Sequence, residues 1–177
     1  KLIPELAYQL RDLQHNSKDL LQLLCKADNP VYFFKPQAQM KLQTLHIGGC
    51  KQLTLLDVSK LTELTMLNCA YSNIVVLDVT NNTNLEALYC SGNLLAELNI
   101  STLSKLERLV CDDNELTMLD ASKNTQLKSL TCTRNQLTSI NVSGLTQLNR
   151  LAVSQNSMLS ELSIAGNTAL NFLHAAY

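Results

Sequence analysis

The chain lacks any excess of basic residues. Charged residues make up only 16% of its 177 residues and the formal net charge is −1, whereas soluble domains typically carry about 25% charged residues. Nucleic acids and anionic membrane surfaces both attract proteins with a basic excess. The composition therefore argues against nucleic acid or an anionic membrane as the main partner.

Long apolar runs are also missing. No run approaches the ~18 apolar residues that indicate a membrane-spanning helix, so no membrane span is expected. Five glycines and three prolines are too few for a long flexible linker or low-complexity tract. No signal peptide is visible and the chain opens on Lys1. We therefore expect that a leader was removed or that the chain is a piece of a longer protein.

The features of an enzyme are missing too. His15, His46 and His174 lie far apart in the sequence, so none is expected to join a Ser or Cys in a catalytic triad. No phosphate-cradling loop is present, and no pair of carboxylates lies in a context that suggests a desolvated acid. We predict no catalytic residue, no cofactor and no metal site.

What the chain has in abundance is leucine at a fixed period. Five leucines lie 21 residues apart, and one more on either side lies 22 residues away: Leu64, Leu85, Leu106, Leu127 and Leu148, with Leu42 before them and Leu170 after them. Self-similarity at a period of about 20–30 residues predicts a solenoid, in which each unit buries its apolar edge by stacking on its neighbours.

The unit that begins at Leu85 (position 1) contains L-x-x-L-x-C-x-x-N-x-L, and its second half repeats the theme as L-x-x-L-D-V-x-x-N/L in the neighbouring units. This pattern resembles the leucine-rich repeat family, and its nested form an irregular 21-residue subclass found mostly in bacteria. The resemblance covers residues 42–177. It implies a right-handed coil with a parallel β-sheet, in which positions 3 to 7 form a short strand. We expect a repeat domain at 40–177, with six full units and a partial seventh.

The second half of each unit is too short for a regular helix. Both sides of the solenoid are therefore expected to be strand-like or extended, with low curvature.

Residues 1–39 break the period. Pro4 and the apolar spacing that follows predict one helix, and a second is expected to end at Asn29-Pro30. Residues 31–34 are predicted to form a short edge strand. We interpret this segment as an N-terminal helical cap over the open end of the repeats; the alternative is the tail of a preceding domain.

Position 6 carries cysteine in four consecutive units: Cys69, Cys90, Cys111 and Cys132. Parallel strands would hold these thiols in a line about 4.8 Å apart, which suits neither a tetrahedral zinc site nor disulfides. They are interpreted as small buried apolar residues. Cys50, at position 9, is expected to hydrogen-bond the loop backbone, and Cys25 has no obvious partner.

Three further columns are predicted to be structural. Position 9 carries Asn in four units. The resemblance to leucine-rich repeats implies that these side-chain amides are buried and form hydrogen bonds with the backbone of the loops. Position 19 alternates Leu with Asn, either as two equivalent corner fillers or as the trace of a 42-residue duplication. Position 15 carries Asp, Asn or Ser, which we interpret as a solvated ladder rather than a calcium site.

Function is expected from the exposed positions 3, 5, 7 and 8 on the side of the first strand in each unit. Aromatic residues and Arg anchor interfaces, and such residues gather on this face. The predicted ligand-binding residues are Met66, Tyr71, Tyr89, Arg108, Val110, Asp113, Arg134 and Arg150. The alternative is that these solvent positions carry no constraint.

Two functions remain open. One is a non-catalytic module of a bacterial surface or secreted protein that binds a protein or glycan ligand. The other is a cytoplasmic scaffold, or an effector delivered into host cells, in which the repeats position another domain. We also expect the C-terminal end of the solenoid to be covered by further repeats, another domain or a partner, because an unpaired terminal strand promotes aggregation.

Overall fold

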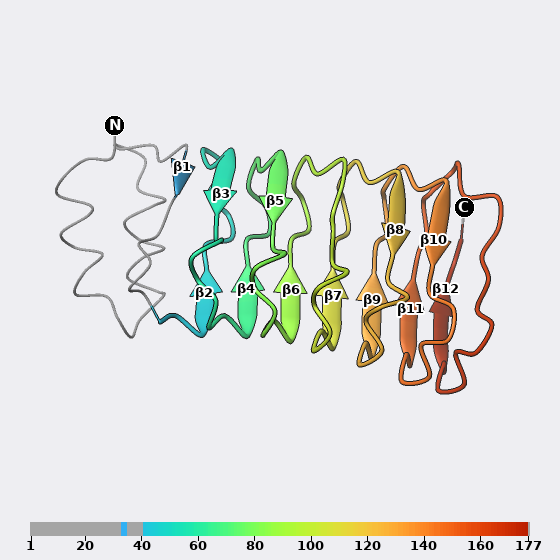
Figure 1. Cartoon of the computed structure of the whole chain (residues 1–177). Coiled ribbons are helices and arrows are strands. Elements are labelled where there is room, and N and C mark those ends of the chain that lie inside the picture. The colour runs from blue at the N-terminus through green and yellow to red at the C-terminus, as the bar shows by residue number, and fades with distance from the viewer. Residues whose placement is uncertain (1–32, 35–40, 177) are drawn as a thin grey trace, which may run out of the picture.

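The structure, a computed structural model, describes residues 33–34 and 41–176. These residues form a leucine-rich repeat solenoid whose turns stack side by side along a nearly straight axis (Figure 1). One side, here called the front sheet, is a seven-stranded parallel sheet in the order β12-β11-β9-β7-β6-β4-β2. Its strands are β2 (Thr44–His46), β4 (Met66–Asn68), β6 (Ala87–Tyr89), β7 (Arg108–Val110), β9 (Ser129–Thr131), β11 (Arg150–Ala152) and β12 (Phe172–His174).

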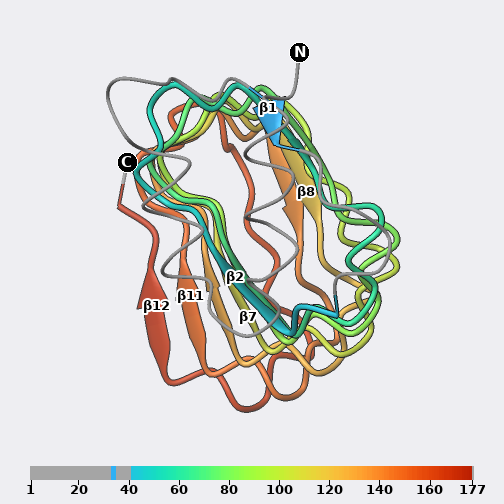
Figure 2. The same ribbon diagram turned by 90° about the vertical axis from the view of Figure 1, so that its left-hand side faces the viewer.

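The opposite side, here called the back side, is also strand-like but interrupted. Three strands, β1 (Phe33–Phe34), β3 (Leu55–Asp57) and β5 (Val76–Asp78), form one parallel sheet. Two more, β8 (Met118–Asp120) and β10 (Ser139–Asn141), form another. Seen along the axis, the two sides enclose a closed oval section (Figure 2). The expected extended second side and low curvature are confirmed.

Alternation along each strand separates core from surface. In β4 the middle residue Leu67 is fully buried while Met66 and Asn68 are partly exposed. The back strands follow the same rule, since Leu77 is buried between two exposed residues of β5. Because every turn keeps the same register, position 4 of one unit lies beside position 4 of the next. A 21-residue spacing in sequence thus becomes a column about 4.8 Å per turn in space.

The asparagines at position 9 hold the loops between front and back. The Asn114 amide donates to the carbonyls of Cys90 at 3.0 Å and Cys111 at 3.2 Å, and its Oδ1 accepts from the Leu95 N–H at 3.1 Å. Asn93, Asn135 and Asn156 make the equivalent bonds in their own turns. The predicted role of this column is confirmed.

At position 19, leucine and asparagine alternate from one turn to the next. The Asn82 amide donates to the carbonyls of Val58 and Leu61 in the preceding turn, at 3.0 and 2.8 Å. Leu61 itself is fully buried and fills the same corner with apolar atoms. The corner-filler interpretation is confirmed, while a duplication of 42 residues stays a hypothesis about origin.

Other expectations are corrected or lie outside the description. Cys50 is disulfide-bonded, so its predicted hydrogen bond to the loop backbone is wrong. The front strands span positions 3 to 5 and are shorter than the predicted positions 3 to 7, although backbone hydrogen bonds between neighbouring turns continue at positions 6 and 8. The strand predicted at 31–34 is confirmed at Phe33–Phe34, where it pairs with β3. The predicted cap helices and the pairing of Cys25 lie outside the described residues.

Replacing Asn114 by alanine would leave a buried N–H and buried carbonyls without partners. Unmet buried polar groups are costly, so we expect Asn114→Ala to lower the free energy of unfolding by about 2–4 kcal/mol. Chemical denaturation measures this. Asn149→Ala is the matched control, because Asn149 is exposed, and we expect it to change stability little. Equal losses in the two variants would contradict the structural role of the column.

Candidate functional site: the front sheet and its rim

The front sheet presents two outward rows of side chains. In the position 3 row, Met66 lies beside Ala87, and Ala87 lies beside Arg108. In the position 5 row, Tyr89 lies between Asn68 and Val110. Strand alternation therefore places four of the predicted site residues, Met66, Tyr89, Arg108 and Val110, on one face of three neighbouring strands, β4, β6 and β7.

A third row, here called the left-handed row, follows the C-terminal ends of these strands. It consists of position 8 of the six full units, and every member has a positive φ: Gly49, Tyr71, Gly92, Asp113, Arg134 and Gln155. Such backbone suits glycine and is unfavourable for bulky side chains. Four of the six residues are nevertheless not glycine. Since strained backbone gathers at functional sites, this row is a candidate binding rim.

Tyr71 is the most prominent member of the row. Its side chain is 64% exposed, although tyrosine usually buries much of its ring. The ring lies against Gly92 in the next turn, where a built Cβ would approach Tyr71 Cδ1 to 2.5 Å. A side chain at position 92 would therefore displace the ring. Glycine at position 92 therefore allows the positive φ and also leaves the space that the Tyr71 ring occupies.

Asp113 and Arg134 bind each other along the same row. Both guanidinium nitrogens Nε and Nη2 of Arg134 donate to the Asp113 carboxylate. This hydrogen bond from Arg134 holds the pKa of Asp113 below its usual value. The two residues thus present a paired, nearly neutral group at physiological pH, and not the separate charges that the sequence indicates.

Two other arginines of the predicted set differ in their surroundings. Arg150 lies over the Phe172 ring, with its Cζ 3.8 Å from the ring centroid, a cation–π contact between β11 and β12. Arg108 is exposed on β7 and makes no ion pair among the described residues. Arg108 is therefore the predicted cation best placed to meet an acidic group of a partner.

The four cysteines of position 6 lie beneath the front sheet as free, fully buried thiols. The Cys111 Sγ donates to the Thr131 carbonyl of the next turn at 3.4 Å. Burial raises the pKa of the Cys69 thiol to about 12, and burial also raises the pKa of Cys90. Cys69 and Cys90 are therefore held as neutral thiols, which are poor nucleophiles. The full burial of all four cysteines agrees with their predicted packing role.

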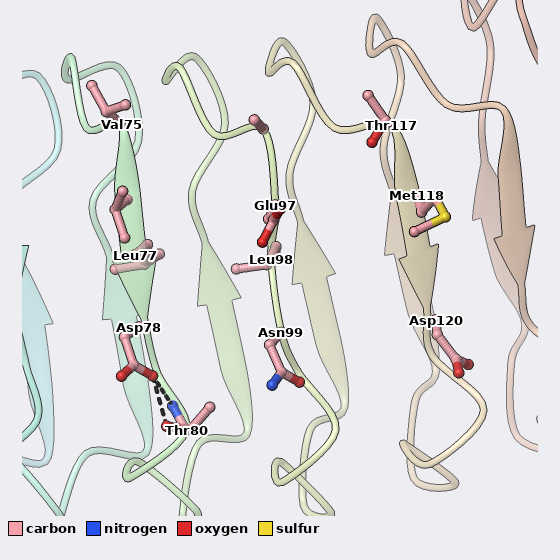
Figure 3. A pocket seen from close by; sticks show the side chains of 12 residues that line it. Val75, Leu77, Asp78, Thr80, Glu97, Leu98, Asn99, Thr117, Met118 and Asp120 are labelled. Carbon is pink, nitrogen blue, oxygen red and sulfur yellow. Dashed lines mark hydrogen bonds between the residues drawn. The ribbon is translucent and has the colours of Figure 1, made fainter.

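The back side contains a feature that the sequence interpretation missed. Residues 96–99, which lie between β5 and β8, form no strand and make no backbone hydrogen bond to either neighbouring turn within the described chain. At this break lies a pocket of about 930 Å³, here called the back-face pocket, whose walls are three neighbouring chain segments (Figure 3). Val76 and Met118 stand at its two sides, 61% and 65% exposed.

The left-handed row and the exposed apolar residues of the back-face pocket, which the sequence interpretation missed, can both be recognised in the sequence. Gly49 and Gly92 fall at position 8, where a recurring glycine indicates a positive φ. At position 13, Val76 and Met118 are apolar where alternation predicts exposure. The break at 96–99 left no comparable trace, because Leu98 and Asn99 match the pattern of the other units.

Gln155 tests the strain of the left-handed row without an ion pair to complicate it. Glycine adopts positive φ freely, so we expect Gln155→Gly to raise the free energy of unfolding by about 1 kcal/mol. Gln136→Gly is the control, because Gln136 is exposed and has no positive φ; there glycine should lower stability by about 0.5–1 kcal/mol. Denaturation curves that move in the same direction for both variants would contradict a strained row.

Thiol labelling tests the cysteine column. With raised pKa values and no solvent access, Cys69, Cys90 and Cys111 should not react with iodoacetamide in the native protein at pH 8. The same residues should react within minutes once guanidinium unfolds the chain. Mass spectrometry of tryptic peptides locates the label at each position. If Cys90 of the native protein were labelled as fast as a solvent-exposed thiol, its burial would be contradicted.

No helix among the described residues has the length and apolarity to cross a membrane. In the same part of the chain, no three His, Cys, Asp or Glu side chains are grouped to hold a metal ion.

The fold is shared with known proteins, although no protein-family model and no curated protein sequence matches the chain. The functional domain of InlJ from Listeria monocytogenes, described as including a cysteine ladder, is similar with a TM-score of 0.79 and 33% identity. That match covers 86% of this chain, which spans only 34% of the InlJ chain.

A more distant structure shows similarity at the level of the fold. The leucine-rich repeat ectodomain of the receptor kinase SOBIR1 from Arabidopsis thaliana has a TM-score of 0.50 and 19% identity, over 84% of this chain and 74% of that one. An internalin (inlF) from Listeria monocytogenes has a TM-score of 0.49 and 20% identity, over 77% and 48%. The chain is therefore a leucine-rich repeat solenoid of 21-residue turns, and the functional domain of the bacterial protein InlJ is among its structural neighbours.

Proposed function

We propose that the chain is a non-catalytic binding module that holds a protein ligand on the front sheet and its left-handed row. The predicted contact residues are Met66, Tyr71, Tyr89, Arg108 and Val110. Asp113, Arg134 and Arg150 extend the same surface toward the later turns. A glycan ligand is the second possibility for this surface, since Tyr71 and Tyr89 offer aromatic rings for stacking.

The observation that carries the proposal is the display of Tyr71. A left-handed backbone at a bulky residue costs of the order of 1–2 kcal/mol, and exposure forgoes the stabilisation that burial of the ring would bring. The fold keeps both unfavourable features and supports the ring on Gly92. A rigid, solvent-facing aromatic side chain is a typical anchor of protein interfaces.

The rigidity of the front sheet supports the same function. Its seven strands are paired in unbroken register, and the leucines beneath them, such as Leu67, Leu88 and Leu109, are fully buried. A surface that is already ordered loses little conformational entropy when a ligand binds. The back side lacks this continuity, so the front sheet is the better preorganised face.

The disulfide of Cys50 supports export from a bacterial cell. Disulfides persist mainly in oxidising compartments, such as the cell surface and the extracellular medium. The buried thiols of position 6 do not argue against export, because they are shielded from oxidants. We therefore favour a surface or secreted protein over a cytoplasmic scaffold or a host-delivered effector.

The last turn supports the expectation of a covering element. Leu173 is 46% exposed on β12, and Ile164 is 41% exposed in the preceding loop, although both occupy positions that are buried in earlier turns. Further repeats, another domain or a partner would remove this apolar surface from water.

The test replaces Tyr89 and Arg108 together by alanine and measures capture of purified extracellular proteins and of arrayed glycans. We expect the double variant to bind a captured ligand at least about tenfold more weakly, which corresponds to roughly 1.4 kcal/mol. Protein and glycan ligands are distinguished by the array to which the wild-type chain binds.

The matched control changes the other side of the solenoid. Val76→Thr with Met118→Thr removes two exposed apolar side chains from the back side and should leave capture by the front sheet unchanged. Circular dichroism confirms that each variant is folded. Unaltered capture by a folded Tyr89→Ala/Arg108→Ala variant would refute the front sheet as the binding surface.

A further inference from the structure

We propose that the back-face pocket is a second binding site, which accepts an extended peptide segment of another protein with an aliphatic residue at position i and Lys or Arg at i+2. The proposal is independent of the ligand proposed for the front sheet, because it concerns the opposite side of the solenoid.

The apolar part of the site is a hollow between two exposed ridges. Val76 and Met118 occupy the same position in two units that are two turns apart. They are therefore separated by roughly 10 Å along the solenoid axis. Val75 and Ala96 continue the apolar lining, and both are exposed as well. An aliphatic side chain of a partner that enters this hollow would remove apolar surface from water on both ridges.

The acidic part of the site lies two residues further along each segment. Asp78 follows Val76 on β5, and Asp120 follows Met118 on β8, with Asn99 between them. Residues i and i+2 of a strand lie about 6.7 Å apart on one face. The acidic row therefore runs parallel to the apolar row at the spacing that separates i and i+2 of an extended partner.

The Asp78 carboxylate is charged and keeps one oxygen available for a cation. In Asp78, the Thr80 N–H and hydroxyl both donate to Oδ1, at 2.9 and 2.7 Å, which leaves Oδ2 for another donor. These bonds lower the pKa of Asp78, so the group is ionised at neutral pH. Glu97 adds a third carboxylate within the pocket, and none of the lining residues is basic.

The charge of the pocket selects among possible occupants. A second copy of this chain seated back to back would place Asp78, Glu97 and Asp120 against the same carboxylates, which repel. An anionic lipid surface is repelled for the same reason. The pocket lining offers no aromatic ring on which a sugar could stack. A peptide that combines aliphatic and cationic side chains satisfies both rows.

The break in the back sheet explains why the site occurs at this turn. Where back strands pair, as in β3 with β5 and β8 with β10, adjacent chain segments close the surface. Residues 96–99 are released from that pairing. Glu97 occupies position 13 of this segment, so its carboxylate lies in register between Val76 and Met118.

The experiment uses the protein with its methionine methyl groups isotopically labelled, because two methionines report on the two faces. Met118 stands on the back-face pocket and Met66 on the front sheet. The probe is the capped octapeptide Val-Thr-Lys-Thr-Val-Thr-Lys-Thr, which repeats the proposed pattern. One comparison peptide has Glu in place of Lys. The other, Val-Lys-Thr-Thr-Val-Lys-Thr-Thr, keeps the composition but places Val and Lys on opposite faces.

We expect the Met118 methyl resonance to shift on titration with the first peptide while the Met66 resonance stays in place. Both comparison peptides should bind at least about tenfold more weakly, and a rise in salt from about 50 to 300 mM should weaken the first peptide, since ions screen exposed charges.

Two double variants test the two rows. Val76→Thr with Met118→Thr removes the apolar ridges, and its affinity is followed by fluorescence anisotropy of the labelled peptide. Asp78→Asn with Asp120→Asn removes charge and retains the local turn, as Asn99 and Asn141 show in the neighbouring units. We expect each to raise the dissociation constant at least about tenfold, while Tyr89→Ala/Arg108→Ala leaves it unchanged.

Three outcomes would overturn the proposal: no shift of Met118 at millimolar peptide, wild-type affinity in both double variants, or equal affinity for the Glu peptide. A dimer in sedimentation equilibrium that Val76→Thr/Met118→Thr dissociates would assign the surface to a second copy of the chain instead. Because Met66 and Met118 report separately, failure here is distinguishable from failure of the function proposed for the front sheet.

Discussion

The in-register stacking of one turn on the next is the constraint on which the rest of the structure depends. Parallel pairing fixes neighbouring turns about 4.8 Å apart, so each position of the 21-residue unit becomes a column. A column must then be chemically consistent along its length. Leucine at position 4 forms a dry core, and in the four turns that carry it, asparagine at position 9 joins the turn to the preceding one through its amide. No turn could keep its shape without its neighbours.

This constraint also explains which polar groups are structural. The cysteine column replaces larger apolar residues beneath the front sheet and lies fully buried. The asparagines of position 19 satisfy corner carbonyls in alternate turns, where leucine fills the same space in the others. The cysteine and asparagine columns, which resemble binding sites in the sequence, therefore have a structural role in the solenoid. What is left for recognition is the set of side chains that stacking does not dictate.

Those side chains fall on two faces with different character. The front sheet is continuous and carries aromatic, aliphatic and cationic groups, with Tyr71 held on Gly92 at its rim. The back side is interrupted at residues 96–99 and carries apolar ridges beside carboxylates. A single solenoid thus offers a flat preorganised surface and a hollow acidic one, which can be occupied at the same time.

The sequence by itself determined the period, the core columns, the extended character of both sides and which residues face outward, because a fixed spacing and strand alternation leave only one such arrangement. Only the tertiary structure decided how outward side chains pair. Arg134 is bound to Asp113 and Arg150 lies on Phe172, while Arg108 stays unpaired among the described residues. The disulfide of Cys50 and the break at 96–99 were likewise beyond the pattern. Periodicity specifies the column to which a residue belongs, whereas contacts between long side chains and the loss of a backbone ladder depend on local distances between turns.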